Sequence, residues 1–256
     1  MRYSDQNGFI TGSKSMIKKC IVICISFSLQ AINIDNLPKL SNQDIPDIMQ
    51  ATRLPENIVT HYLPILHRVE RNFVNLVSNA YPVVVGIVKK YQPKTFCEVG
   101  VAFGMQSFEI LISTNVEKLY GVDPYKNFPD YQDPMNLPQP LFDLVYYHVH
   151  KRFESFGSRA TLIRALSVQA AQLFAPHSLD MVYIDANHSY EGVQADLSAW
   201  YDKVKPGGII SGDDYGGATF PGVTQAVDEF IARNHLTLQR DLVIEKRTWW
   251  AEKPIR

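Results

Sequence analysis

The feature that most constrains the fold is a glycine-rich turn between two short apolar runs. The first run, 95–99, is followed by Gly100 and Gly104, and a helical pattern then covers 105–113. A second apolar run, 119–122, comes next. Strand, glycine turn, helix and strand in this order predict half of a nucleotide-binding βαβ unit. Glycine suits such a turn because backbone and ligand can approach where a Cβ would clash.

Two acids mark the ligand side of this predicted unit. Glu98 lies in the first strand, and Asp123 closes the second strand 25 residues later. A carboxylate in the second position can accept hydrogen bonds from a ribose, so we predict that role for Asp123. The Glu-x-Gly-x-x-x-Gly spacing differs from the Gly-x-Gly-x-x-Gly of dinucleotide sites, which set a pyrophosphate on a helix N-terminus.

Strand and helix patterns alternate through the rest of the chain. Further strands are predicted at 160–165, 179–184, 208–211, 242–246 and 248–252, and further helices at 141–156, 168–174, 190–204 and 223–234. Lys205 to Gly208 are expected to end the helix before the fifth strand. The alternation predicts an α/β fold with a doubly wound, mostly parallel seven-stranded sheet.

The N-terminal part of the chain does not share this alternation. Residues 16–31 hold two lysines and a short apolar run, which is typical of a secretory signal peptide with an internal start at Met16 and too short for a stable membrane span. Residues 35–56 indicate a linker with at most short turns.

Helical periodicity begins after this linker and continues to the first strand. It covers 57–79, where Pro64 is expected to kink or divide the helix, and 81–91. We therefore expect a signal-like or disordered segment (1–35), a linker with an N-terminal helical extension (36–79) and an α/β domain (80–256).

A proline-rich insertion follows Asp123. Residues 124–140 contain five prolines and three aromatic residues, Tyr125, Phe128 and Tyr131. Such a segment cannot form a regular helix or a central strand. Because it leaves the carboxyl end of a strand, where open α/β sheets bind ligands, we predict a lid or pocket wall; a surface excursion is the alternative.

Three further acids lie at predicted strand ends. Asp185 follows the strand at 179–184, and Asp213 and Asp214 follow the next strand. These strand ends meet in one cleft, where carboxylates need a cation or a shared proton, and oxygen ligands suit Mg²⁺, Ca²⁺ or Mn²⁺. In the alternative without metal, Asp185 faces the cofactor and the other two acids cap a turn.

Charge and cysteine content narrow the classes of partner. The formal net charge is −1, so nothing indicates nucleic acid as a partner. Three cysteines form neither a disulfide framework nor a zinc site. The sequence leaves the oligomeric state open, with a homo-oligomer among the outcomes.

These motifs resemble those of the class I methyltransferases that use S-adenosylmethionine. The glycine turn resembles their first motif, and Lys-Pro-Gly-Gly before the fifth strand is common among them. The run Asp-Ala-Asn-His-Ser-Tyr-Glu from Asp185 resembles a bacterial group with Asp-x-x-His-x-Tyr-Glu after strand four. The resemblance covers roughly residues 80–252 and implies a Rossmann-like methyltransferase domain.

The resemblance also implies which residues contact the cofactor. Glu98 and the turn through Gly100, Val101 and Gly104 would hold the methionine part of S-adenosylmethionine, and Ser167 would contact the adenine. Asp185 lies on the cofactor side of the same cleft in this interpretation.

The acids are spaced as in the metal site of catechol O-methyltransferases, and macrocin-type sugar O-methyltransferases have a similar layout. Asp213 follows Asp185 by 28 residues, and Asp214 is adjacent. The resemblance implies that these three hold Mg²⁺. In the catechol enzymes a lysine base lies three residues after the first acid; this chain has His188 there, as the macrocin-type enzymes have a histidine. Asp214 replaces an asparagine of the catechol pattern.

We therefore expect a metal-assisted O-methyltransferase that acts on a small hydroxylated molecule, such as a sugar, with His188 and Asp185 as catalytic residues. A cytoplasmic location fits a cytosolic cofactor, and export or membrane association through 16–31 is the alternative. Two rival functions are a metal-independent N- or C-methyltransferase and a non-catalytic cofactor-binding protein on the same fold.

Overall fold

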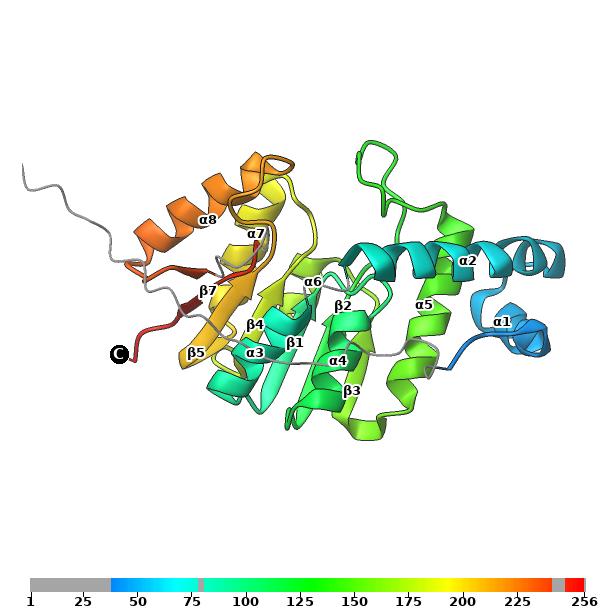
Figure 1. Cartoon of the computed structure of the whole chain (residues 1–256), viewed down its shortest axis with the longest axis horizontal. Coiled ribbons are helices and arrows are strands. Elements are labelled where there is room, and N and C mark those ends of the chain that lie inside the picture. The colour runs from blue at the N-terminus through cyan, green and yellow to red at the C-terminus, as the bar shows by residue number, and fades with distance from the viewer. Residues whose placement is uncertain (1–37, 78–80, 241–246, 256) are drawn as a thin grey trace, which may run out of the picture.

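One sheet organises the structure, a computed structural model that describes residues 38–77, 81–240 and 247–255. Within these residues seven strands follow the order β3-β2-β1-β4-β5-β7-β6 (Figure 1). The first five strands pair in parallel, and β7 runs antiparallel to β5 and β6. The predicted doubly wound, mostly parallel sheet is confirmed.

The element bounds agree closely with the sequence pattern in the first βαβ unit. The strands are β1 (Thr95–Val99), β2 (Lys118–Val122), β3 (Ala160–Ile163), β4 (Leu179–Ile184), β5 (Val204–Gly212), β6 (Gln239–Arg240) and β7 (Trp249–Glu252). The α-helices are α1 (Ile45–Thr52), α2 (Glu56–Val77), α3 (Tyr81–Tyr91), α4 (Met105–Ser113), α5 (Gln139–Glu154), α6 (Ser167–Ala171), α7 (Tyr190–Tyr201) and α8 (Pro221–Arg233).

Helices cover both faces of the sheet because successive side chains of a strand point to opposite sides. On one face Phe96 and Tyr183 pack with residues of α1 to α5. On the other face their neighbours Cys97 and Val182 pack with residues of α6, α7 and α8. The result is a three-layer helix–sheet–helix arrangement whose strands are buried on both sides.

The N-terminal extension packs against the sheet domain. At most short turns were expected over 35–56, which is wrong for α1: Ser41 and Asp44 form a capping box, Pro46 lies in the first turn, and Ile48 is fully buried. Pro64 does not divide α2, which continues through it. Figure 1 shows α2 lying beside α5, which it contacts.

The Lys205–Gly208 motif does not form the turn expected from the sequence. α7 already ends at Tyr201, and the motif lies inside β5, at an irregularity in its pairing with β4. Gly207 has a φ of +76°, and its N–H donates to the carbonyl of Lys253 at 2.7 Å. The motif is therefore held by residues after β7 that are distant in sequence.

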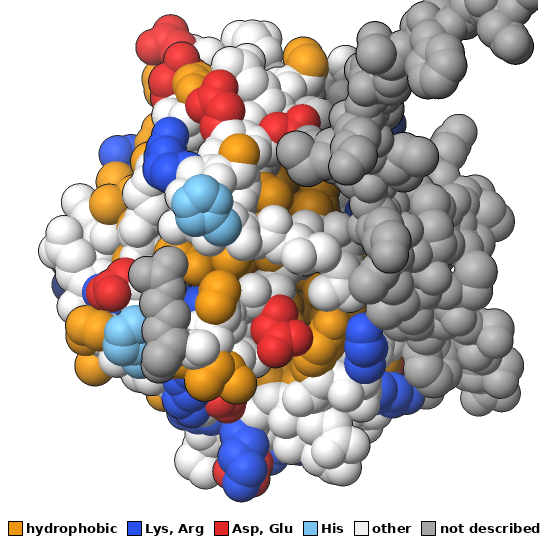
Figure 2. Space-filling view, turned by 90° about the vertical axis from the view of Figure 1, so that its left-hand side faces the viewer, with side chains coloured by type: hydrophobic (Ala, Val, Ile, Leu, Met, Phe, Trp, Pro, Cys, Tyr) orange, Lys and Arg blue, Asp and Glu red, His pale blue; other side chains and the backbone are white. Residues whose placement is uncertain are grey.

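Two predicted segments, 16–31 and 242–246, lie outside the described residues. Among the helices that the structure describes, none is both long and apolar enough to cross a membrane. On the face shown in Figure 2, acidic and basic side chains are interspersed, in keeping with the formal net charge of −1.

Candidate active site

Gly100 and Gly104 are required by the protein's own backbone and packing. Gly100 has a φ of +91°, and a Cβ there would lie 1.8 Å from the carbonyl oxygen of Asp185. Gly104 has a φ of +74°, and a Cβ there would lie 3.0 Å from the ring of Phe108. The turn after β1 thus packs directly against the end of β4, and the expected closeness to a ligand is not needed to explain these glycines.

Asp123 fixes the same turn, a role that the sequence did not reveal. Its Oδ2 accepts the backbone N–H groups of Val101 and Ala102, both at 3.0 Å, and its Oδ1 accepts that of Tyr125 at 2.8 Å. Burial raises the pKa of Asp123, and these hydrogen bonds oppose the rise. Two carboxylate oxygens offer about four acceptor positions, so capacity remains for the predicted ribose contact.

Glu98 lies buried at the end of β1, facing the first turn of α4. The amide of Gln106 donates to its Oε1 at 3.0 Å, and the hydroxyl of Ser107 donates to Oε2. Burial, with a contribution from the charge of Asp185, raises the pKa of Glu98 to about 8, against the effect of these hydrogen bonds. Glu98 therefore carries a proton at neutral pH before any ligand binds. The sequence placed Gln106 and Ser107 on a helix but gave no sign of this contact.

Ser167 uses its side chain within the protein. Its hydroxyl accepts the indole N–H of Trp200 at 2.8 Å and hydrogen-bonds to Asp196, both on α7. The adenine contact expected of Ser167 stays a prediction. If it forms, the backbone N–H at the start of α6 is the group that remains to make it.

The acids after β4 and β5 converge, with one difference from the predicted set. Asp185, His188 and Asp214 each place one ligand atom within 4.8 Å of the others. Asp213 is not part of this group; burial and the charges of Asp185 and Asp214 raise its pKa to about 7. The two carboxylates could hold a divalent cation. The His188 imidazole lies beside them, where Asp213 was expected, and its Nε2 could serve either as a further ligand or as a proton acceptor.

His188 lies between the two carboxylates of this cluster. Its Nε2 is 3.2 Å from Asp185 Oδ1 and 3.2 Å from Asp214 Oδ2, and its ring stacks on Phe220 with centroids 4.3 Å apart. Burial alone would lower its pKa, but hydrogen bonds to Asp133 and Asp185 and the neighbouring carboxylate charges raise the pKa of His188 to about 10. The imidazole is therefore protonated at neutral pH.

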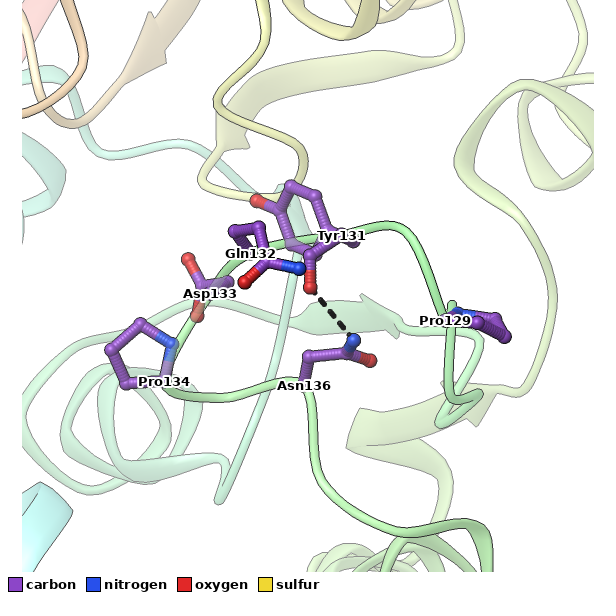
Figure 3. Close-up of a pocket in the computed structure, with 6 residues that line it drawn as sticks. All are labelled: Pro129, Tyr131, Gln132, Asp133, Pro134 and Asn136. Atoms are coloured by element: carbon purple, nitrogen blue, oxygen red, sulfur yellow. Dashed lines mark hydrogen bonds between the residues drawn. The ribbon is translucent and has the colours of Figure 1, made fainter.

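The proline-rich segment reaches this cluster. Tyr131 Oη accepts the backbone N–H of His188 at 3.3 Å and lies 3.3 Å from its Nδ1, and Asp133 Oδ2 lies 3.5 Å from Nδ1. The segment is the green loop at the top of Figure 1, and it lines a pocket of about 490 Å³ (Figure 3). Its role as a lid stays a prediction. Tyr131 was part of the predicted lid, whereas no sequence pattern pointed to Asp133.

An arginine that the sequence did not single out completes the surroundings of Asp214. Arg247 Nη1 lies 3.3 Å from Asp214 Oδ1, and the carbonyl of Arg247 accepts the N–H of Tyr215 at 2.9 Å. Since Arg247 lies just before β7, its approach to the site depends on the antiparallel pairing of that strand with β5.

Comparison with known sequences gives a family match and a curated relative. Residues 97–215 match the model of a family described as a methyltransferase domain. An uncharacterised protein of Acanthamoeba polyphaga mimivirus is 27% identical over 144 residues, which are 54% of this chain. The alignment spans 59% of the viral protein, less than two thirds of its length.

Solved structures share the fold. A Klebsiella pneumoniae protein assigned as an O-methyltransferase has a TM-score of 0.54 at 15% identity, over 83% of this chain and 97% of that one. A Staphylococcus aureus protein assigned as a caffeoyl-CoA O-methyltransferase has a TM-score of 0.53 at 11% identity, over 82% and 98%. A calicheamicin methyltransferase has a TM-score of 0.51 at 18% identity, over 89% and 99%. The family model thus matches less than half of this chain, and the solved structures share its fold.

Proposed function

We propose that the protein is an S-adenosylmethionine-dependent O-methyltransferase that methylates a hydroxyl of a small molecule with the help of a divalent cation. The observation that carries the proposal is the convergence of Asp185, His188 and Asp214 within 4.8 Å, at the edge of the sheet where Glu98 and Asp123 also lie. The O-methyltransferase assignments of proteins with the same fold support the choice of oxygen. A sugar is the first acceptor to test, because the sequence resembles macrocin-type enzymes.

The cofactor contacts that we propose are those expected from the sequence, with the adjustments that the geometry requires. Asp123 would accept a ribose hydroxyl with its remaining capacity, and Glu98 with the turn at 100–104 would hold the methionine part. Ser167 would contribute its backbone N–H to the adenine. Each of these assignments is part of the proposal.

The chain's task in the reaction is to align the acceptor and to receive its proton. The acceptor oxygen attacks the methyl carbon as the carbon–sulfur bond breaks, which gives a methyl ether and S-adenosylhomocysteine. A cation held by Asp185 and Asp214 would lower the pKa of the acceptor hydroxyl. With these carboxylates neutralised, the pKa of His188 would fall toward its ordinary range, and its Nε2 would accept the proton as a general base.

A metal-independent methyltransferase is the second candidate, and one observation favours it. His188 and Arg247 already place positive charge beside Asp185 and Asp214, so the cluster has counter-charges of its own. An acceptor nitrogen or carbon would then meet a site that needs no cation. A non-catalytic cofactor-binding protein is the third candidate function, because the fold alone does not determine activity.

Calorimetry and a methyl-transfer assay test the proposal together. S-adenosylhomocysteine should bind, and transfer of labelled methyl to a panel of sugars and catechols should stop in EDTA and return with Mg²⁺ or Mn²⁺. Asp214→Asn should mimic EDTA while leaving S-adenosylhomocysteine binding intact. Asp202→Asn, which alters an exposed acid next to α7, is the matched control. It should change neither the binding of S-adenosylhomocysteine nor the rate of methyl transfer.

Each rival predicts a different result. Full turnover in EDTA would favour the metal-independent methyltransferase. Cofactor binding without transfer to oxygen, nitrogen or carbon acceptors would favour the binding protein. No binding of S-adenosylhomocysteine would refute the methyltransferase itself.

A further inference from the structure

We propose that Asp133 and Tyr131, on the segment between β2 and α5, are positioning residues of the active site. They hold the Nδ1 side of the His188 ring and thereby aim Nε2 at Asp185 and Asp214. This inference rests on the proposed function, because it assigns these two residues to the reaction of that site.

The first step of the argument is that His188 is held on every side. Tyr131 and Asp133 lie at Nδ1, at 3.3 and 3.5 Å, while two carboxylates lie at Nε2, both at 3.2 Å. Phe220 stacks on the ring at an interplanar angle of 23°. The side chain is 17% exposed although it lies in a loop just before α7. A histidine that served only to begin the helix would need none of these contacts.

The second step is that the segment is built to present Asp133 in one orientation. Asp133 Oδ1 accepts the backbone N–H of Met135 at 2.7 Å, which leaves Oδ2 for His188. The amide of Asn136 donates to the carbonyls of Phe128 at 2.6 Å and Tyr131 at 2.8 Å, so it ties the two arms of the loop together. These side-chain hydrogen bonds hold the loop in the way that backbone hydrogen bonds hold a helix or a strand, and they fix the orientation of the Asp133 carboxylate.

Figure 3 shows six residues of this segment as sticks. Tyr131, Gln132 and Asp133 follow one another on the loop, and a dashed line marks the contact between Asn136 and Tyr131. The same residues line the pocket of about 490 Å³. An acceptor bound there would lie against the segment that holds His188.

The third step is chemical. The two ring nitrogens of histidine have distinct roles, and the hydrogen bond made by one determines the tautomer and orientation of the other. A carboxylate and a hydroxyl at Nδ1 keep the ring from rotating about its Cβ–Cγ bond. Nε2 then stays directed at Asp185 and Asp214, where either proton transfer or cation binding would require it. Asp133 and Tyr131 act through His188 and need not touch the acceptor.

Nitrogen-15 NMR of histidine-labelled protein tests the inference directly. The ring signals of His188 are identified by their loss in His188→Gln. In Asp133→Asn and in Tyr131→Phe we expect these signals to move or broaden, while the affinity for S-adenosylhomocysteine stays within about two-fold, a change of well under 1 kcal/mol. Asp130→Asn, which alters an exposed acid of the same segment, is the matched control and should leave the signals unchanged.

The methyl-transfer assay supplies a second measurement. Loss of an outer hydrogen bond to a metal-binding histidine typically costs about 10–100-fold in metal affinity or activity. We expect kcat of Asp133→Asn to fall by a similar factor, with KM for S-adenosylmethionine unchanged. Asp133→Glu, which restores a carboxylate, should recover part of the loss.

The alternative is that the contacts only fasten the segment. In that case His188, still held at Nε2 and stacked on Phe220, would keep its ring signals in Asp133→Asn, while cleavage of the segment by a protease would become faster. That result would overturn the inference and leave the proposed function standing. Failure of the wild-type protein to bind S-adenosylhomocysteine would refute the proposed function instead, whatever the His188 signals show.

Discussion

At the scale of single residues, Glu98 shows how burial prepares a group for a charged ligand. Its pKa of about 8 arises first from burial, and the charges of Asp185 and Asp123 add to it. Most copies of the protein therefore hold a proton on Glu98 at pH 7. A positively charged methionine part placed beside it would favour the ionised carboxylate and release that proton.

The first prediction concerns this proton. Calorimetry of S-adenosylmethionine binding at pH 7, repeated in buffers of different ionisation enthalpy, should show release of up to about one proton per site. Glu98→Gln should bind without this release, because the amide does not titrate. Equal proton counts for the two proteins would show that Glu98 does not face the charged part of the cofactor.

At the scale of elements, the segment between β2 and α5 is ordered by Asn136. Its side chain donates two hydrogen bonds, and its Oδ1 accepts the N–H of Phe128 at 3.0 Å and the side-chain amide of Asn127 at 3.2 Å. The prolines of the segment reduce the freedom of its unfolded forms, so a few hydrogen bonds suffice to hold it. This explains how a loop without helix or strand can carry Tyr131 and Asp133 to His188.

The second prediction follows from this arrangement. Asn136→Ala removes four hydrogen bonds, each of which contributes about 0.5–1.5 kcal/mol, so limited proteolysis within 124–138 should become several-fold faster. Asn57→Ala, at an exposed position of α2, should leave the cleavage rate as it is. If the segment closes over bound ligands, S-adenosylhomocysteine with an acceptor should slow the cleavage of the wild-type protein. Equal cleavage of Asn136→Ala and wild type would show that the loop is held by other contacts.

The packing of α2 on α5 depends on a buried ion pair. Glu70, 4% exposed, accepts hydrogen bonds from Arg152 and, at 3.2 Å, from His148 Nε2. Burial alone would raise the pKa of Glu70, but these two partners lower it to about 2. The carboxylate therefore stays ionised in the folded protein at pH values where it would be protonated in the unfolded chain.

The third prediction concerns the stability of this pair. Glu70→Gln leaves Arg152 buried without a counter-charge and should lower the free energy of unfolding by about 3–5 kcal/mol. Glu154→Gln, at the exposed pair with Lys151, should change it by less than about 1 kcal/mol. Denaturant titrations at pH 7 measure the free energy of unfolding of both variants. If Glu70→Gln lowered it as little as Glu154→Gln does, the buried ion pair would not stabilise the protein in this way.

The same pair gives a dependence on pH with a definite sign. The folded pKa of about 2 lies below the ordinary value of 4.5, so the contribution is complete above pH 4.5 and is lost as the pH falls from there toward 2. The loss should be on the order of 3 kcal/mol, since one pKa unit corresponds to about 1.4 kcal/mol. Glu70→Gln should lack this part of the acid dependence.

At the scale of the whole molecule, the helical extension and the sheet share one hydrophobic core. Ile48 of α1 and Leu66 of α2 are fully buried in the same cluster as Phe96 of β1. The backbone carbonyl of Pro38 also accepts a hydrogen bond from Arg152 Nε at 3.0 Å. The extension is therefore part of the structure that supports the α/β domain, although the sequence suggested a boundary at residue 80.

The fourth prediction tests this unity. A chain shortened to residues 80–256 loses the cover of α5 and the partner of Arg152, so it should show no cooperative thermal transition and should bind a dye for exposed apolar surface. A chain of residues 36–256 keeps these contacts and is the control, with an expected cooperative transition. A cooperative transition of 80–256 at the same temperature would show that the boundary suggested by the sequence is also a folding boundary.

The sequence by itself determined the elements whose pattern is local. The bounds predicted for the helix at Met105–Ser113 and the strand at Leu179–Ile184 agree with the structure, because apolar periodicity and the residues that end an element are neighbours in the chain. The acids at the strand ends were also visible, since parallel strands bring their carboxyl ends to one edge. The same alternation predicted a mostly parallel sheet, whereas the order of its strands is known from the structure alone.

Tertiary structure alone decided what depends on partners distant in sequence. Lys205 to Gly208 became part of β5 because Lys253 bonds to it, and the hydroxyl of Ser167 was taken by Trp200. His188 acquired its raised pKa from carboxylates on three separate loops, one of which carries Asp133. Periodicity reports which face of an element is buried, but the charge and hydrogen-bond partners at a site arise only when the chain brings those loops together.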